Sequence, residues 1–170
     1  MQLDIYQAET AAHAAKQDLI LQEARQNLEN AGHLSALEFS GAVHALQVLV
    51  ENAIGKSKHW LIALKLPVPV SAYDAFTLLQ QKQLIASDDL AAWQRAIGLR
   101  NRIVYDYLNL NDDVIYQLIQ TDAYRFMIDF LNRLIETSSR ENFIESVVIP
   151  GLARNPGFCL GISGFRPRWE

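Results

Sequence analysis

The residues of this chain whose types could act together in chemistry lie in one short segment of its second half. Arg100 carries a planar, permanently charged guanidinium group, which binds phosphate or carboxylate oxygens in pairs. The neighbouring Asn101 can orient such a group through its amide. Tyr105 and Tyr107 hold their protons at neutral pH, because an unperturbed tyrosine titrates at about pH 10. The segment therefore predicts a polar, phosphate-binding active site within a helix.

Helical geometry separates these residues. Arg100 and Tyr107 share one face, because seven residues nearly complete two turns, and they lie about 10 Å apart along the axis. Position 105 is turned about 140° away from Arg100. One helix does not easily focus these groups on a single phosphate, whereas two copies facing each other across a two-fold axis could. The sequence itself shows only this geometric need.

Five helices are expected to position the motif. Gly32 is placed to end the first, and Pro67 and Pro69 exclude a helix between the second and third. Ser71 is an N-cap candidate, with Asp74 as an acidic residue in the first turn. No alternating strand pattern occurs, so we expect an all-α, up-and-down antiparallel bundle. The expected helices cover about residues 3–30, 35–64, 71–82, 87–107 and 114–137.

Apolar residues at helical spacing predict the buried faces of the first two helices. The stripe is partial in the first helix and broad in the second. Its members are Leu19, Leu21, Ala24 and Leu28 in the first helix, and Leu37, Val43, Leu46, Leu49, Val50, Ala53 and Ile54 in the second.

Length and composition limit the possible functions. The 170 residues, 50% hydrophobic and 20% charged, suit one helical domain, expected over 1–145, with an extension over 146–170. The net charge of −4 argues against broad nucleic-acid binding but allows a small basic site for one strand of RNA. No apolar stretch is long enough to cross a bilayer and no signal-peptide pattern is present, so we expect a cytoplasmic protein without membrane contact.

Neither a metal nor a cofactor is expected. The single cysteine, Cys159, excludes an intramolecular disulfide and a cysteine-rich zinc site. His13, His33, His44 and His59 all precede the motif, at spacings that support no metal site, and we interpret them as surface or interface residues. His44 or His59 could still reach the motif in three dimensions, and their spacing does not decide this.

The end of the chain differs from the rest. After Pro150, glycine and proline are dense and the charge is locally basic. Composition favours a mobile extension. The alternative is an arm that packs on a partner through the aromatic residues Phe158, Phe165 and Trp169.

The motif resembles the Arg-x4-His-x-Tyr signature of the HEPN superfamily. It is most similar to the signature of HepT-like toxins, which pair with minimal nucleotidyltransferase antitoxins. Arg100, Asn101 and Tyr107 fit the signature, and Tyr105 stands where the family has its histidine. The resemblance covers about residues 1–140. It also includes the proline break with the helix after it, 64–79, and the pattern Ala45-Leu46-Gln47 with Glu51.

This resemblance implies a metal-independent endoribonuclease, in which a ribose 2′-hydroxyl attacks the adjacent phosphate. Arg100 would bind the phosphate, Asn101 would orient it, and Tyr105 would occupy the acid–base position in a cleft shared by two subunits. Histidine suits proton transfer because its pKa lies at about 6.5, and tyrosine does not. Losing acid–base catalysis costs about 10² to 10⁴ in rate, so we expect weak or no RNA cleavage.

The resemblance also implies a partner and a modification. In HepT-like toxins the tyrosine that matches Tyr107 receives adenylate groups from the nucleotidyltransferase antitoxin, which silences the toxin. The neighbours of Tyr107 here, Asp106 and Leu108, are compatible with such AMPylation.

Alternatives remain open at this stage. The chain could be a non-catalytic subunit that binds a nucleotidyltransferase and presents substrate to it. Arg100 alone could form an ordinary surface ion pair, for example with Asp106. Tyr105 is either natural or acquired by selection against a toxic protein, because one base change converts a histidine codon to tyrosine.

Overall fold

The structure is a computed structural model that describes residues 3–106, 108 and 110–135. This part of the chain forms six α-helices and no strand, which confirms the expected all-α fold. None of these helices is long and apolar enough to span a membrane. The predicted extension over 146–170 lies outside the described residues. The helices are α1 (Leu3–Ala31), α2 (Ala36–Ala63), α3 (Ala72–Gln81), α4 (Ser87–Tyr105), α5 (Asp112–Gln120) and α6 (Arg125–Asn132).

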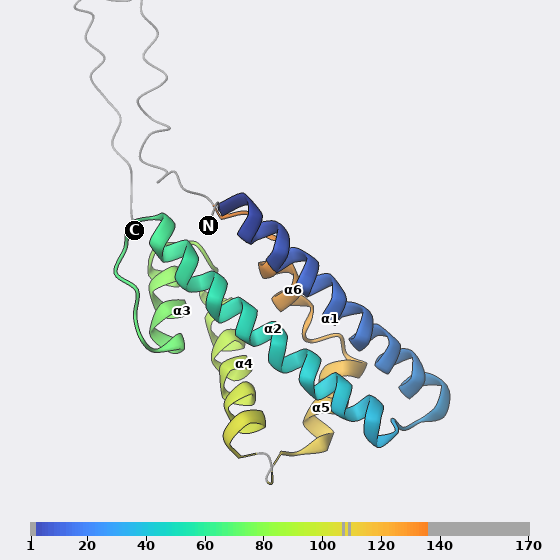
Figure 1. Ribbon diagram of the computed structural model, residues 1–170. Helices are drawn as coiled ribbons and strands as arrows, with labels where there is room; N and C mark the ends of the chain where they lie inside the picture. The colour runs from blue at the N-terminus through green and yellow to red at the C-terminus, as the bar shows by residue number, and fades with distance from the viewer. Residues whose placement is uncertain (1–2, 107, 109, 136–170) are drawn as a thin grey trace, which may run out of the picture. The chain divides into compact units, whose positions relative to one another are not determined.

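α2 is the central helix of the described bundle, since it contacts α1, α3, α4 and α6 (Figure 1). Gly32, with a φ of 74°, ends α1 as predicted. The Ser35 hydroxyl then accepts a hydrogen bond from the Glu38 backbone N–H, and the Glu38 carboxylate accepts one from the Ser35 N–H at 2.7 Å. This reciprocal capping box fixes the start of α2.

An aromatic cluster holds α4 in place. Trp93 of α4 is 1% exposed, and it stacks on Phe76 of α3 with ring centroids 4.3 Å apart. It also meets the edge of Phe130 of α6 at 4.9 Å. Ile97, one turn further along α4, is buried on the same face. The direction of α4 is therefore set by the core one turn before Arg100.

Most residues of the predicted apolar stripes are buried, but two predictions were wrong. The side chains of Leu19 and Leu37 are 66% and 84% exposed. Leu19 lies about 180° from Leu28 around α1, and Leu37 lies about 180° from Leu46 around α2, at about 100° per residue. Both leucines therefore lie on the outer faces of their helices.

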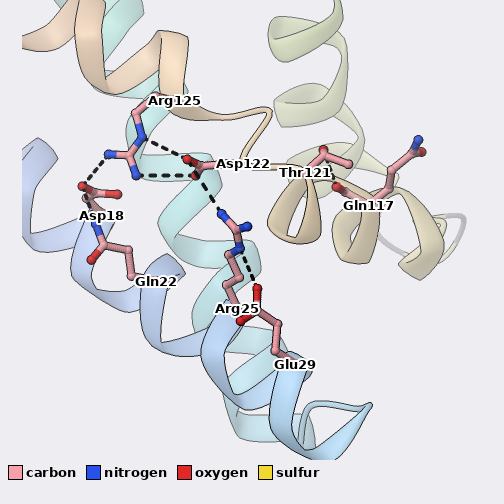
Figure 2. A network of polar contacts seen from close by, with 8 residues as sticks. All are labelled: Asp18, Gln22, Arg25, Glu29, Gln117, Thr121, Asp122 and Arg125. Atoms are coloured by element: carbon pink, nitrogen blue, oxygen red, sulfur yellow. Dashed lines mark hydrogen bonds and ion pairs between the residues drawn. The ribbon is translucent and has the colours of Figure 1, made fainter.

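The single last helix expected over 114–137 is wrong, because the turn 121–124 divides it into α5 and α6. Asp122 has a φ of 55°, which does not fit a right-handed helix. In Figure 2, Arg125 joins this turn to α1, with contacts of 3.2 Å to Asp122 and 2.8 Å to Asp18. Apolar residues continue at helical spacing across the turn, so the apolar pattern alone does not predict the break between α5 and α6.

Lys56 links α2 to the end of α6. Its side chain is 1% exposed, and its Nζ donates hydrogen bonds to the carbonyl oxygens of Leu131, at 2.7 Å, and of Arg133. The Nζ also lies 5.7 Å from the ring centroid of Phe130. Burial, with a further contribution from the Arg133 charge, lowers the pKa of Lys56 to about 8. The end of α6 is thus held by a buried basic group.

Candidate functional site

Arg100 is the centre of the polar contacts in the motif. Its side chain is 21% exposed and reaches across to α2. There a single carboxylate oxygen, Glu51 Oε1, accepts a hydrogen bond from Arg100 Nε at 2.7 Å and forms an ion pair with Nη2 at 2.6 Å. The Glu51 contact is the largest of the effects that raise the pKa of Arg100. Arg100 is therefore a fixed cation at the point where α4 leaves the core.

Asn101 holds the other side of the guanidinium group. Arg100 Nη1 donates a hydrogen bond to Asn101 Oδ1 at 3.1 Å. Tyr105 also hydrogen-bonds to the guanidinium group, so Glu51, Asn101 and Tyr105 all contact it. The planar fork of arginine suits phosphate oxygens, and a phosphate could take the place of the exposed Tyr105 side chain.

Tyr105 lies beside Arg100, although the sequence predicted that it points away. Its ring centroid is 5.7 Å from the guanidinium carbon, within cation–π range, and the side chain is 76% exposed. Helical geometry fixes only the direction of the Cα–Cβ bond. Since Tyr105 is the last residue of α4, its long side chain can turn back toward the preceding turn. The structure therefore brings Arg100, Asn101 and Tyr105 together.

The helix that carries the motif is shorter than expected. α4 ends at Tyr105, and Asp106 has a φ of −137° and a ψ of 41°, which are not helical values. Aspartate and asparagine are frequent after position 105, and both compete with helical hydrogen bonding. The predicted end of this helix at about residue 107 is therefore two residues too late. Tyr107, the predicted modification site, lies outside the described residues, and so does its predicted alignment with Arg100.

The histidines do not replace the missing motif histidine in any described contact. His13, His33 and His44 are exposed, and His59 packs on Tyr6 with ring centroids 4.0 Å apart. His44 lies on the same face of α2 as Glu51, but two turns away. Among the described residues, no group of His, Cys, Asp and Glu side chains is arranged to hold a metal ion.

Glu51 is the residue of this site whose role sequence reasoning missed. The family resemblance includes Glu51 in the pattern with Ala45-Leu46-Gln47, but it assigns this residue no role in the site. Its partner Arg100 is 49 positions away, so the pairing depends on how α4 packs against α2. Glu51 is the one carboxylate among the four side chains of the cluster, which are Glu51, Arg100, Asn101 and Tyr105.

Residues 14–136 match the family model described as ribonuclease HepT-like. The chain is 38% identical over 78 residues to the mRNA nuclease HepT of Shewanella oneidensis, a match that covers 44% of this chain. It spans 56% of the length of that relative.

The fold is similar to those of solved toxin–antitoxin structures. A tri-AMPylated HEPN toxin of Shewanella oneidensis, in complex with MNT antitoxin, superposes with a TM-score of 0.65 at 24% identity. That match covers 74% of this chain and 96% of the other. A toxin–antitoxin crystal structure with AMP-PNP gives a TM-score of 0.63 at 23% identity, over 74% of this chain and 97% of the other. Similarity at these identities concerns the fold.

Proposed function

Because the chain belongs to the ribonuclease HepT-like family, we propose that it is the toxin of a toxin–antitoxin pair, a HEPN endoribonuclease with one replaced active-site residue. The observation that carries this proposal is the fixed Arg100, held by Glu51 and Asn101 beside the exposed Tyr105 side chain. Tyr105 takes the place of the motif histidine and supplies no base. RNA cleavage is therefore weak or absent, with a loss of about 10² to 10⁴ in rate.

The proposed active form is a homodimer with the ends of two α4 helices facing each other around the RNA. One copy supplies one Arg100, and a second copy would double the phosphate contacts. Two exposed apolar side chains at this end, Tyr105 and Leu108, support the proposal, because they are 76% and 82% exposed in a single copy. Their burial between two copies would remove apolar surface from water.

The proposed partner is a nucleotidyltransferase antitoxin of the MNT type, which would silence the toxin by AMPylation of Tyr107. The support is the similar fold of a tri-AMPylated HEPN toxin bound to MNT antitoxin, together with the place of Tyr107 in the motif. A cytoplasmic location, and a domain boundary near residue 145 with an extension over 146–170, remain predictions of the sequence.

The alternative is a non-catalytic subunit that docks a nucleotidyltransferase and presents substrate to it. The replacement of the motif histidine by Tyr105 favours this alternative, because it removes the acid–base group while the scaffold stays intact. In that case Arg100 positions a phosphate-bearing ligand without cleaving it.

Expression in bacteria separates the two functions. We expect Tyr105→His to arrest growth, Tyr105→His with Arg100→Ala to be harmless, and a co-expressed nucleotidyltransferase antitoxin to relieve the arrest. Tyr105→Phe is the matched control, since it changes the same position without adding an imidazole. Normal growth with Tyr105→His at equal protein level would contradict the toxin proposal and support the binding subunit.

A further inference from the structure

Glu51 holds Arg100 in the proposed site, but the proposed function gives its carboxylate no part in the reaction. We propose that the Glu51 carboxylate accepts the proton of the ribose 2′-hydroxyl in this chain, in the place of the missing histidine. This inference rests on the proposed nuclease function. It attributes the weak RNA cleavage expected of this chain to the carboxylate of Glu51.

The contacts of Glu51 leave half of its carboxylate available. Oε1 accepts a hydrogen bond from Arg100 Nε at 2.7 Å and lies 2.6 Å from Nη2 in the ion pair. Oε2 has no hydrogen bond or ion pair to any described residue. The side chain of Glu51 is 41% exposed, so part of it is open to solvent. A proton acceptor is thus present and accessible beside the phosphate-binding residue.

The guanidinium group places acceptor and phosphate next to each other. Glu51 contacts the edge formed by Nε and Nη2, Asn101 accepts from Nη1, and Tyr105 also hydrogen-bonds to the guanidinium group. A phosphate that replaces the exposed Tyr105 side chain on this planar group is therefore a neighbour of Glu51. The attacking 2′-hydroxyl belongs to the ribose that carries this phosphate. Arg100 therefore orients both the phosphate and the base.

The step balances without a metal or a further reactant. The 2′-O–H bond breaks and its proton passes to Glu51 Oε2, while the 2′-oxygen forms a bond to phosphorus. The bond from phosphorus to the 5′-oxygen breaks, and the leaving oxygen takes a proton from water. Glu51 then returns its proton to solvent. The products are a 2′,3′-cyclic phosphate and a 5′-hydroxyl.

The experiment compares initial rates of RNA oligonucleotide cleavage, in metal chelator, for four full-length chains. These are the native chain, Glu51→Gln, Tyr105→His and the double variant. Glutamine keeps the size of the side chain and an oxygen for Arg100, but it does not accept a proton at neutral pH. We expect Glu51→Gln to lower the native rate by about 10² or more, and to have a much smaller effect in the Tyr105→His background.

The pH profile gives a second readout that a merely structural role would not change. The acid limb of the native rate should be lost in Glu51→Gln, and an acid limb should persist in the double variant, where the introduced imidazole accepts the proton. Glu29→Gln is the matched control. It removes the same charge from the Arg25–Glu29 pair on α1, whose contact is 3.0 Å, and should leave both rates unchanged.

Three results would overturn the inference. Equal losses from Glu51→Gln in the native and in the Tyr105→His background would mean that Glu51 only holds Arg100. Cleavage by Tyr105→His together with none by the native chain would remove Glu51 as the base and leave the proposed function intact. No cleavage by any of the four chains would contradict the proposed function as well.

Discussion

Arg100 shows how a single side chain is prepared for an anion. Glu51 accepts a hydrogen bond from Arg100 Nε and Asn101 accepts one from Nη1. Because the guanidinium is already held in place, its side chain loses little conformational entropy when a phosphate binds. The Tyr105 ring lies beside it at 5.7 Å from the guanidinium carbon. These contacts depend on the planar fork of arginine, which a lysine ammonium does not reproduce.

The planar guanidinium of Arg100 should be essential for RNA cleavage, beyond its charge. In a Tyr105→His background, Arg100→Lys should lower the rate of RNA cleavage by about 10² to 10³, nearly as much as Arg100→Ala. A lysine keeps the charge but cannot contact Glu51 and a phosphate through two defined edges. Single-turnover rates measure this, and a lysine variant within a few-fold of arginine would show that charge alone is sufficient.

Lys56 gives a second residue-scale prediction, on the pH dependence of stability. Its pKa is about 8 in the folded chain, against an ordinary value of 10.5. Between about pH 8 and pH 10.5, Lys56 is protonated in the unfolded chain and neutral in the folded chain. The free energy of unfolding therefore rises with pH in this range. From about pH 8 to pH 10, the native chain should gain up to about 1.4 kcal/mol per pH unit relative to Lys56→Met. Urea unfolding at several pH values measures this difference, and parallel pH profiles would contradict it.

At the scale of elements, the local signals at helix starts and stops were reliable. Gly32 ends α1 and Ser71 caps α3, as the sequence predicted, and Ser35, the predicted start of the second helix, is the cap of α2. Each of these signals acts within one turn, so it can be identified without the tertiary structure. The turn at Asp122 was missed because the ion pair between Arg125 and Asp18 of α1, at 2.8 Å, supports it from another helix.

The cap of α2 can be tested directly. Ser35→Ala should lower the free energy of unfolding by about 1 kcal/mol, because it removes the oxygen that accepts from the Glu38 N–H. Ser40→Ala is the matched control, an exposed serine inside the same helix, and it should change stability by less than about 0.5 kcal/mol. Equal effects of the two variants in urea unfolding would show that the cap contributes nothing specific.

The turn between α5 and α6 gives a further test at this scale. Asp122→Ala and Asp122→Gly both remove the contacts with Arg125, but only glycine adopts a φ of 55° without strain. We expect the glycine variant to be more stable than the alanine variant by about 1 kcal/mol, measured by thermal unfolding. A more stable alanine variant would contradict the left-handed conformation of this residue.

At the scale of the whole molecule, the match over residues 14–136 and the all-helical bundle agree on the family. The motif itself could be predicted from sequence, because its residues are close together in the chain. The contact between Glu51 and Arg100 could not be predicted, because it depends on how α2 and α4 pack against each other.

The proposed homodimer is also a property of the whole molecule. Sedimentation should show a dimer at micromolar concentration, and a stable monomer would remove the shared cleft.

The most direct test of the account is the chemistry of the RNA ends after incubation with Tyr105→His in metal chelator. We predict 2′,3′-cyclic phosphate and 5′-hydroxyl ends by mass spectrometry, and their loss when Arg100→Ala is added. Ends with a 3′-hydroxyl and a 5′-phosphate, or intact RNA, would contradict the claim that Arg100, Asn101 and position 105 form a HepT-like nuclease site.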